Sequence, residues 1–307
     1  MFGMFDLVTV GHFSIDYIIS PGIRRSRETL GGPPTFCSLA AKKLSASVSV
    51  VSKVGADFPS EYVEWLTANG VDLSGMSIVE GASTTRFVLR YEEGRRKLRL
   101  KSRAPSIGMD DISDSLRSRA IHAAPIANEL SAETISKMRG LTDVLSLDPQ
   151  GLLRIFDEEG NVDLTKMANH KLLREINIFK SAEKELRSYA GTADPSSAFG
   201  KIHRHGVEII IMTKGSEGSL LSHRGKVYEI PACNPTAFVD PTGAGDVFIG
   251  AFLAEYIRGR EVIWCGCVGS ASASFTVEDL GPSRFGERRE VYERASEIVE
   301  GVRMPRL

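Results

Sequence analysis

Segment 240–246, which reads Asp-Pro-Thr-Gly-Ala-Gly-Asp, holds the residues of this sequence best suited to chemistry, and the helical pattern Val247–Arg258 follows it directly. The small residues 243–245 let the backbone come close to an anion, at which the first N–H groups of the helix and the positive end of its dipole point. Such a loop can stabilise the charge of a phosphoryl group in transfer. Asp246, in the first helical turn, can accept the proton of an attacking hydroxyl. A plain glycine turn in which Asp246 caps the helix is the alternative.

Short apolar runs alternate with helical patterns along the chain. The runs predict strands buried on both faces at Leu7–Val10, Val48–Val51, Val144–Leu147, Ile176–Phe179 and Glu208–Met212. Apolar residues at helical spacing, with Ser or Thr near the start, predict helices at Thr35–Leu44, Ser60–Asn69 and Ser131–Arg139. This alternation predicts a three-layer α/β architecture, in which helices flank a mainly parallel sheet.

Two stretches, Asp16–Leu30 and Thr84–Arg103, lack helical periodicity. The second has the pattern of a hairpin, with arms Arg86–Tyr91 and Arg95–Lys101 around the turn Glu92–Gly94. Charges alternate with leucines in the second arm, which indicates that one face meets water. Both stretches fit a small antiparallel sheet that stands apart from the main one. It could be a lid over a site or an edge decoration, and the pattern favours neither.

The composition indicates a globular protein that binds neither nucleic acid nor a membrane through bulk charge. The 307 residues are 42% hydrophobic and 25% charged, as in a globular protein with a sizeable core, and the formal net charge is −1. That charge gives no bulk attraction to nucleic acid or to a membrane, so we expect neither as a partner. The four cysteines form no CxxC pair, which favours reduced thiols. No apolar run approaches the ~20 residues that span a bilayer, and the N-terminus lacks a signal pattern, so we expect a cytoplasmic protein.

Segment 240–246 resembles the C-terminal signature of the PfkB/ribokinase family of kinases, in which the last Asp is the catalytic base and the Gly-Ala-Gly amides form the anion hole. The other segments that match family motifs follow the expected order and are Gly11–Asp16, Gly31-Gly32, Gly55–Asp57 and Thr213–Gly218. The resemblance covers nearly the whole chain. It implies one ribokinase-like domain over residues 1–307, with a small β lid from about 12–34 and 82–104. It also implies phosphoryl transfer from ATP with Mg²⁺, and leaves a monovalent cation open as an activator.

The resemblance gives individual residues a role. Asp246 would be the catalytic base, and Gly243, Ala244 and Gly245 the anion hole. The residues expected near ATP are Lys180, Thr213, Gly215, Gly218, Thr242, Gly243, Gly245, Ser270 and Ser274. The residues expected near the acceptor are Asp16, Gly31, Gly32, Phe36, Lys53 and Arg103. Glu183 would hold Mg²⁺ through water.

The minor matches also have plainer interpretations. Asp16 could cap the end of a strand, although a carboxylate there can accept hydrogen bonds from two hydroxyls of a polyol and fix its orientation. Gly31-Gly32 could be an ordinary turn. Lys53 could be a solvated charge at a strand end, and Arg103, in an Arg-rich hairpin, could face solvent or point inward from the lid.

Two positions depart from the family pattern. Phe36 stands where the Gly-Gly motif normally ends in an Asn that reaches the sugar. The family's Asn-x-x-Glu, which organises Mg²⁺ through water, is matched to segment 180–183, so that Glu183 is retained and Lys180 puts a cation where a neutral amide is usual. A lysine there could contact phosphate directly. These departures argue against a standard ribokinase.

Stretches 28–32, 51–58, 148–157 and 274–278, with the aromatic residue at 36, are similar to myo-inositol kinases of this family. Myo-inositol is therefore the preferred acceptor, by analogy, since its hydroxyls suit Asp16. A nucleoside kinase is one alternative, because Phe36 or Phe13 could stack on a base, and a ribose- or fructose-type sugar kinase is another. A nucleotide sensor that has lost catalysis is the alternative from a different class. Lids of family members often pair, which leaves a homodimer open.

Overall fold

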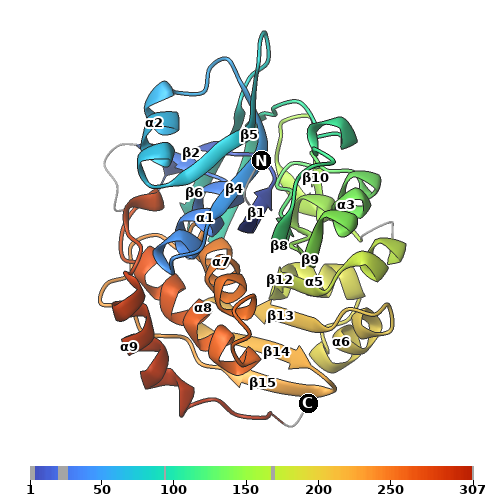
Figure 1. Cartoon of the computed structure of the whole chain (residues 1–307), viewed down its shortest axis with the longest axis vertical. Coiled ribbons are helices and arrows are strands. Elements are labelled where there is room, and N and C mark those ends of the chain that lie inside the picture. The colour runs from blue at the N-terminus through green and yellow to red at the C-terminus, as the bar shows by residue number, and fades with distance from the viewer. Residues whose placement is uncertain (1–3, 20–26, 93–94, 167–169, 306–307) are drawn as a thin grey trace.

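The computed structural model describes residues 4–19, 27–92, 95–166 and 170–305, and a nine-stranded sheet forms the centre of this part of the chain (Figure 1). Its strands lie in the order β15-β14-β13-β12-β9-β8-β1-β4-β5. Their bounds are β1 Phe5–Val10, β4 Val48–Gly55, β5 Val71–Val79, β8 Ser118–Ala123, β9 Thr142–Leu147, β12 Ile178–Ala182, β13 Ile209–Thr213, β14 Ser219–His223 and β15 Lys226–Ile230. Pairing is parallel from β5 to β13, and β14 and β15 add an antiparallel edge.

Helices cover both faces of this sheet. Their bounds are α1 Pro33–Lys43, α2 Ser60–Ala68, α3 Ala132–Met138, α4 Gln150–Leu153, α5 Glu183–Ala190, α6 Pro195–His203, α7 Ala244–Tyr256, α8 Val262–Thr276 and α9 Arg288–Val299. Successive residues of a strand point to opposite faces. Ile209 and Ile211 therefore pack into one core with α1, α7, α8 and α9, and Ile210 and Met212 into a second with α3, α5 and α6 (Figure 1). The predicted three-layer α/β architecture is confirmed.

Each strand and helix predicted from the pattern is present, with its ends moved by up to a few residues. The apolar run Ile176–Phe179 predicts a strand that stops before Lys180, whereas β12 starts at Ile178 and continues to Ala182. Lys180 is thus a strand residue, paired in register with Ile211 of β13. A charged residue inside a central strand breaks the apolar pattern, and this hid the true end of β12.

A second sheet stands apart from the first, with its strands in the order β3-β2-β6-β7. Their bounds are β2 Ser14–Ile19, β3 Arg27–Gly31, β6 Thr85–Glu92 and β7 Arg95–Ser102. We call this the small sheet. β6 and β7 form the predicted hairpin, although Glu93 and Gly94 of its turn lie outside the described residues.

The sequence pattern predicted an antiparallel small sheet. The small sheet is instead mixed, because β2 and β6 pair in parallel. β2 follows β1 and β6 follows β5, and both of these strands run in the same direction in the main sheet. The chain therefore enters the small sheet twice from the same edge of the main sheet. A separate two-stranded ribbon, β10 Arg154–Phe156 and β11 Val162–Leu164, lies further along the chain.

Among the described residues, no helix combines the length and the apolar character that a membrane crossing requires. Cys37, Cys233, Cys265 and Cys267 are all buried and all free thiols.

Candidate active site

The loop before α7 has a fixed shape. Gly243, the residue just before the helix, has a left-handed backbone with φ 79°. A Cβ atom on Gly243 would also lie 2.4 Å from the ring of Phe36, so a side chain is excluded there on two grounds. Asp240 holds the loop, because its Oδ1 accepts hydrogen bonds from the backbone N–H and the hydroxyl of Thr242, at 3.0 and 2.7 Å. The positive end of α7 is therefore held in one place.

This loop forms one wall of a cavity of about 450 Å³. Gln150 after β9, Ala182 at the end of β12 and Thr213 at the end of β13 also line it. The cavity thus lies at the carboxyl edge of the parallel sheet, where α/β folds bind their ligands. The predicted site residues that line it are Asp16, Gly32, Phe36, Lys180, Thr213, Gly215, Gly218, Thr242, Gly243, Ala244, Gly245, Asp246, Ser270 and Ser274.

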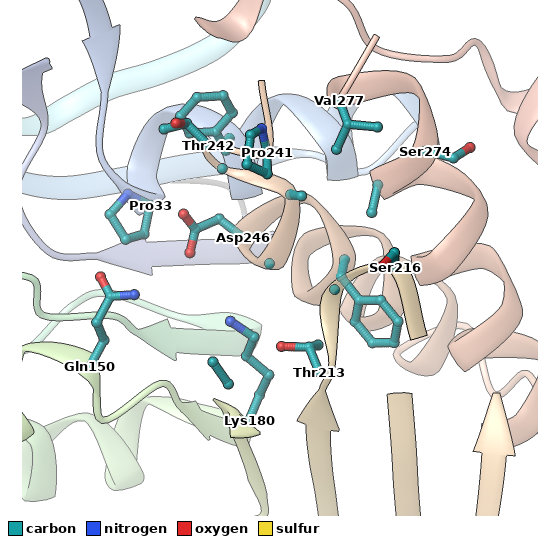
Figure 2. Close-up of a pocket in the computed structure, with 18 of the residues that line it drawn as sticks. Pro33, Gln150, Lys180, Thr213, Ser216, Pro241, Thr242, Asp246, Ser274 and Val277 are labelled. Atoms are coloured by element: carbon teal, nitrogen blue, oxygen red, sulfur yellow. The ribbon is translucent and has the colours of Figure 1, made fainter. Parts of the chain in front are cut away.

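Asp246 lies in the cavity at the first turn of α7. Figure 2 shows its carboxylate, the Lys180 ammonium and the Gln150 amide pointing into the same space from three different elements. Desolvation by the surrounding protein raises the pKa of Asp246 to about 7; the charge of Lys180 opposes this rise, and the charges of Asp148 and Glu185 add to it. A carboxyl group whose pKa lies near neutrality is well suited to accept a proton from a hydroxyl.

The two acidic residues at the start of α5 lie in different surroundings. Glu183, the predicted holder of Mg²⁺-bound water, does not line the cavity and instead pairs with Arg187 at 2.7 Å. Glu185 does line it, and its Oε2 accepts the N–H of Ala182 at 2.9 Å. Burial, with the charge of Asp148 adding to it, raises the pKa of Glu185. Side chains two residues apart on a helix do not share a face, so α5 directs only one of these carboxylates at the cavity.

Lys53 and Arg103 are predicted acceptor contacts, and neither lines the cavity. Lys53 pairs with Asp111 at 2.6 Å and donates to the carbonyl of Ser106. The Arg103 guanidinium lies 4.9 Å from the centre of the Phe156 ring. Both cations thus have partners away from the cavity.

Gly31, a predicted acceptor contact, does not line the cavity but packs against Asp16, which does. A Cβ atom on Gly31 would lie 2.2 Å from Oδ2 of Asp16, so the glycine makes room for that carboxylate. Its neighbour Gly32 has φ 86° and lies against the carbonyl of His12. The Gly-Gly pair therefore places Asp16 beside the start of α1.

The two phenylalanines considered for base stacking are both packed inside the protein. Phe36 is only 1% exposed and lies under Gly243, in a cluster with Ala40 and Val247. Phe13 is fully buried and packs against Phe58. Phe13 does not line the cavity, whereas Phe36 does line it and lies beneath Gly243. Stacking of a base on either ring therefore stays a prediction, which the tight packing of both rings does not favour.

One face of the small sheet forms one end of the cavity, where the acceptor is expected. Asp16 of β2 pairs in register with Phe87 of β6, and Leu89 of β6 pairs with Leu98 of β7. These four side chains line the cavity together with Ser14. The face thus combines one carboxylate with an apolar strip. This strip was not predicted from the sequence, although Phe87 and Leu89 lie two residues apart in a predicted strand and must therefore share one face.

The opposite end of the cavity is formed by the loops after β13 and β15. Gly218, with φ 81°, turns the chain where a Cβ atom would lie 2.2 Å from the carbonyl of Ile230. Phe238, which the sequence analysis did not single out, lines this end and is 67% exposed. Other apolar residues that line the cavity with it are Ala232, Pro235, Ala273 and Val277. This end therefore offers an aromatic ring that is free of tight packing.

The family of this chain follows from comparison with known proteins. The model of the pfkB family carbohydrate kinases matches residues 4–287, so the chain belongs to this family. The predicted family and enzyme class, a kinase, are thereby confirmed.

The relatives differ in their acceptors. The cytidine kinase of Thermococcus kodakarensis is 30% identical over 286 residues, which cover 91% of this chain and 98% of the relative. The inositol 3-kinase of Arabidopsis thaliana is 28% identical over 292 residues, which cover 91% of this chain and 76% of the relative. A solved pyrophosphate-dependent kinase of the ribokinase family, in complex with a pyrophosphate analogue and myo-inositol, has a TM-score of 0.80 at 23% identity, over 94% of this chain and 99% of that one.

Proposed function

We propose that this kinase transfers the γ-phosphoryl group of ATP to a hydroxyl of a nucleoside. Asp246 accepts the proton of that hydroxyl, and the loop of Gly243, Ala244 and Gly245 with the start of α7 stabilises the charge of the phosphoryl group. The position of Asp246 beside this loop, at the carboxyl edge of the sheet, supports the assignment.

The observation that carries the choice of acceptor is the shared face of Asp16 and the apolar strip of Phe87, Leu89 and Leu98. A nucleoside has a polar sugar and a flat base. Asp16 can accept hydrogen bonds from two sugar hydroxyls, while the strip packs against the base. A fully hydroxylated ring would instead place hydroxyls against the strip, where they lack partners and cost free energy.

Mg²⁺ is the metal that this reaction class uses, and when bound it neutralises phosphate charge. Glu185 fits a role in holding its water ligands, because it is a buried carboxylate that lines the cavity. Burial raises the pKa of Glu185 because it disfavours the ionised carboxylate, and a nearby cation would offset this cost by stabilising the negative charge. We therefore assign to Glu185 the role that the sequence pattern gave to Glu183.

Myo-inositol is the second candidate acceptor. It is favoured by the polar groups of Gln150, Arg154 and Ser14, which line the cavity in addition to Asp16. The similarity to inositol 3-kinases adds weight to it.

A panel of acceptors tests the proposal directly. With ATP and Mg²⁺, we expect kcat/KM for cytidine or adenosine to exceed that for myo-inositol and ribose by ~10-fold or more. Myo-inositol would leave hydroxyls without hydrogen-bond partners against the apolar strip, and ribose has no base to pack there. Leu98→Gln should lower nucleoside use and narrow the gap. A preference for myo-inositol would reject the nucleoside assignment. Phosphorylation of no acceptor despite ATP binding would favour the inactive sensor instead.

A further inference from the structure

Lys180 is a charged residue inside the central sheet. Its side chain is 4% exposed, and its Nζ lies 2.6 Å from Oδ2 of Asp148, whose own side chain is 3% exposed. Lysine is rarely buried in this way without a partner. Buried ion pairs seldom add stability beyond that of well-packed apolar residues, because both charges lose their hydration. The pair therefore calls for a reason other than stability.

The Lys180 ammonium lies against the loop of Gly243, Ala244 and Gly245, which we call the anion loop. A Cβ atom on Gly245 would lie 2.8 Å from Nζ, so only the absence of a side chain at position 245 lets the ammonium approach the first turn of α7. Figure 2 shows the side chain rising from β12 toward the space that Asp246 also faces. A fixed cation and the positive end of a helix thus converge on one volume.

Asp148 keeps this cation charged. Burial alone would lower the pKa of Lys180, but Asp148, Asp246 and Glu185 outweigh it and raise the pKa above its ordinary value. Asp148 is itself oriented, because its Oδ1 accepts the backbone N–H of Gln150 at 3.1 Å. The two strand ends of β9 and β12 therefore hold the ammonium in one position.

Building on the proposed function, we propose that Lys180 contacts the γ-phosphoryl group of the donor during transfer, and that Asp148 is the positioning residue that aims its ammonium. Charge on the phosphoryl oxygens develops in a site of low dielectric, where a preorganised cation stabilises it strongly. The chain thus carries a resident cation beside the anion loop, in addition to any bound metal ion.

The variants K180M and K180M/D148N separate this role from a structural one. K180M leaves the Asp148 charge buried and unpaired, which destabilises the fold. The double variant removes both charges, and the amide oxygen that D148N introduces can still accept the N–H of Gln150. We expect the double variant to recover the wild-type Tm while kcat stays ~10²–10³-fold below wild type, as for loss of one oxyanion donor.

Binding of ATP and of ADP, measured by calorimetry without acceptor, tests the contact independently of the reaction. A residue that touches only the γ-phosphoryl group should affect ATP alone, so the double variant should bind ATP ~10-fold more weakly and ADP unchanged. Equal losses for ATP and ADP, or a double variant with wild-type kcat and ATP affinity, would overturn the proposal. If the wild type phosphorylates no acceptor, the proposed function fails, and the ATP-to-ADP comparison still decides the role of Lys180.

Discussion

Replacing Asp246 with Asn keeps the size of the side chain and removes the group that accepts the proton of the acceptor. Loss of a general base lowers the rate by ~10²–10⁴-fold. Asn is also favourable at a helix N-terminus, so α7 should begin at the same residue and the Kd for ATP should change little. Because the base acts only when ionised, wild-type kcat/KM should rise with pH through about 7, the pKa of Asp246. The residual rate of the variant should lack this rise.

The same raised pKa predicts a change in stability. Folding raises the pKa of Asp246 from the ordinary 3.8 to about 7, so the folded state holds this proton more tightly than the unfolded state. Ionised Asp246 therefore weakens the fold increasingly as pH rises through this window. At ~1.4 kcal/mol per pKa unit, the destabilisation approaches ~4 kcal/mol above neutral pH. Asp246→Asn removes it, and the variant should be the more stable protein at alkaline pH.

Urea unfolding at about pH 5.5 and about pH 8 measures this effect. The free energy of unfolding of Asp246→Asn, minus that of wild type, should grow by about 2 kcal/mol between these two values. Glu183→Gln, which neutralises a carboxylate outside the cavity, is the matched control for the loss of one negative charge. A constant difference, or a variant that keeps more than about a third of wild-type turnover when chemistry limits the rate, would refute the assignment of Asp246 as a base with a raised pKa.

Substitutions at three further positions, Glu185, Asp16 and Phe238, test the rest of the site. Glu185→Gln should raise the Mg²⁺ concentration needed for half-maximal rate, whereas Glu183→Gln should leave it unchanged. Titration of the rate against Mg²⁺ measures both. The reverse result would assign the metal role to Glu183. Asp16→Ala should lower kcat/KM for the acceptor by ~10-fold or more without changing the KM for ATP, since each charge-assisted hydrogen bond is worth ~1.5–3 kcal/mol, and Asp16→Asn should be milder. We also propose that the adenine of ATP stacks on the exposed ring of Phe238, which lines one end of the cavity. Phe238→Ala should then raise the KM for ATP by ~10-fold, because stacking of a base on an aromatic ring is worth ~1–3 kcal/mol. An unchanged KM would place the adenine elsewhere.

The fold and the loop before α7 could be predicted from the sequence because their signals are local. Strands buried on both faces give apolar runs, and helices give a period that survives without knowledge of their partners. Residues 240–246 combine small residues, a helix start and a carboxylate within one short segment. Asp246 and the small residues before it therefore needed no distant residue to be singled out as a candidate site.

The pairing inside the small sheet is less local. The sequence showed two non-helical stretches, but the parallel pairing of β2 with β6 depends on where the main sheet delivers the chain. That pairing sets Asp16 beside Phe87 and creates the apolar strip at the end of the cavity where we propose that the acceptor binds. For this reason the motifs favour myo-inositol as the acceptor, whereas the cavity favours a nucleoside.

By itself, then, the sequence determined the architecture and the family, and it singled out Asp246 as the candidate base, since each has a signal within one segment. Only the tertiary structure decided which of two neighbouring carboxylates on α5 lines the cavity, because a helix turns about 100° per residue and nothing in the local pattern marks the inward face. It also decided that Phe36 lies beneath Gly243 and that Lys180 pairs with Asp148, 32 residues away in the chain. Contacts between residues distant in sequence are set by the packing of whole elements, and this packing is what a single sequence leaves unstated.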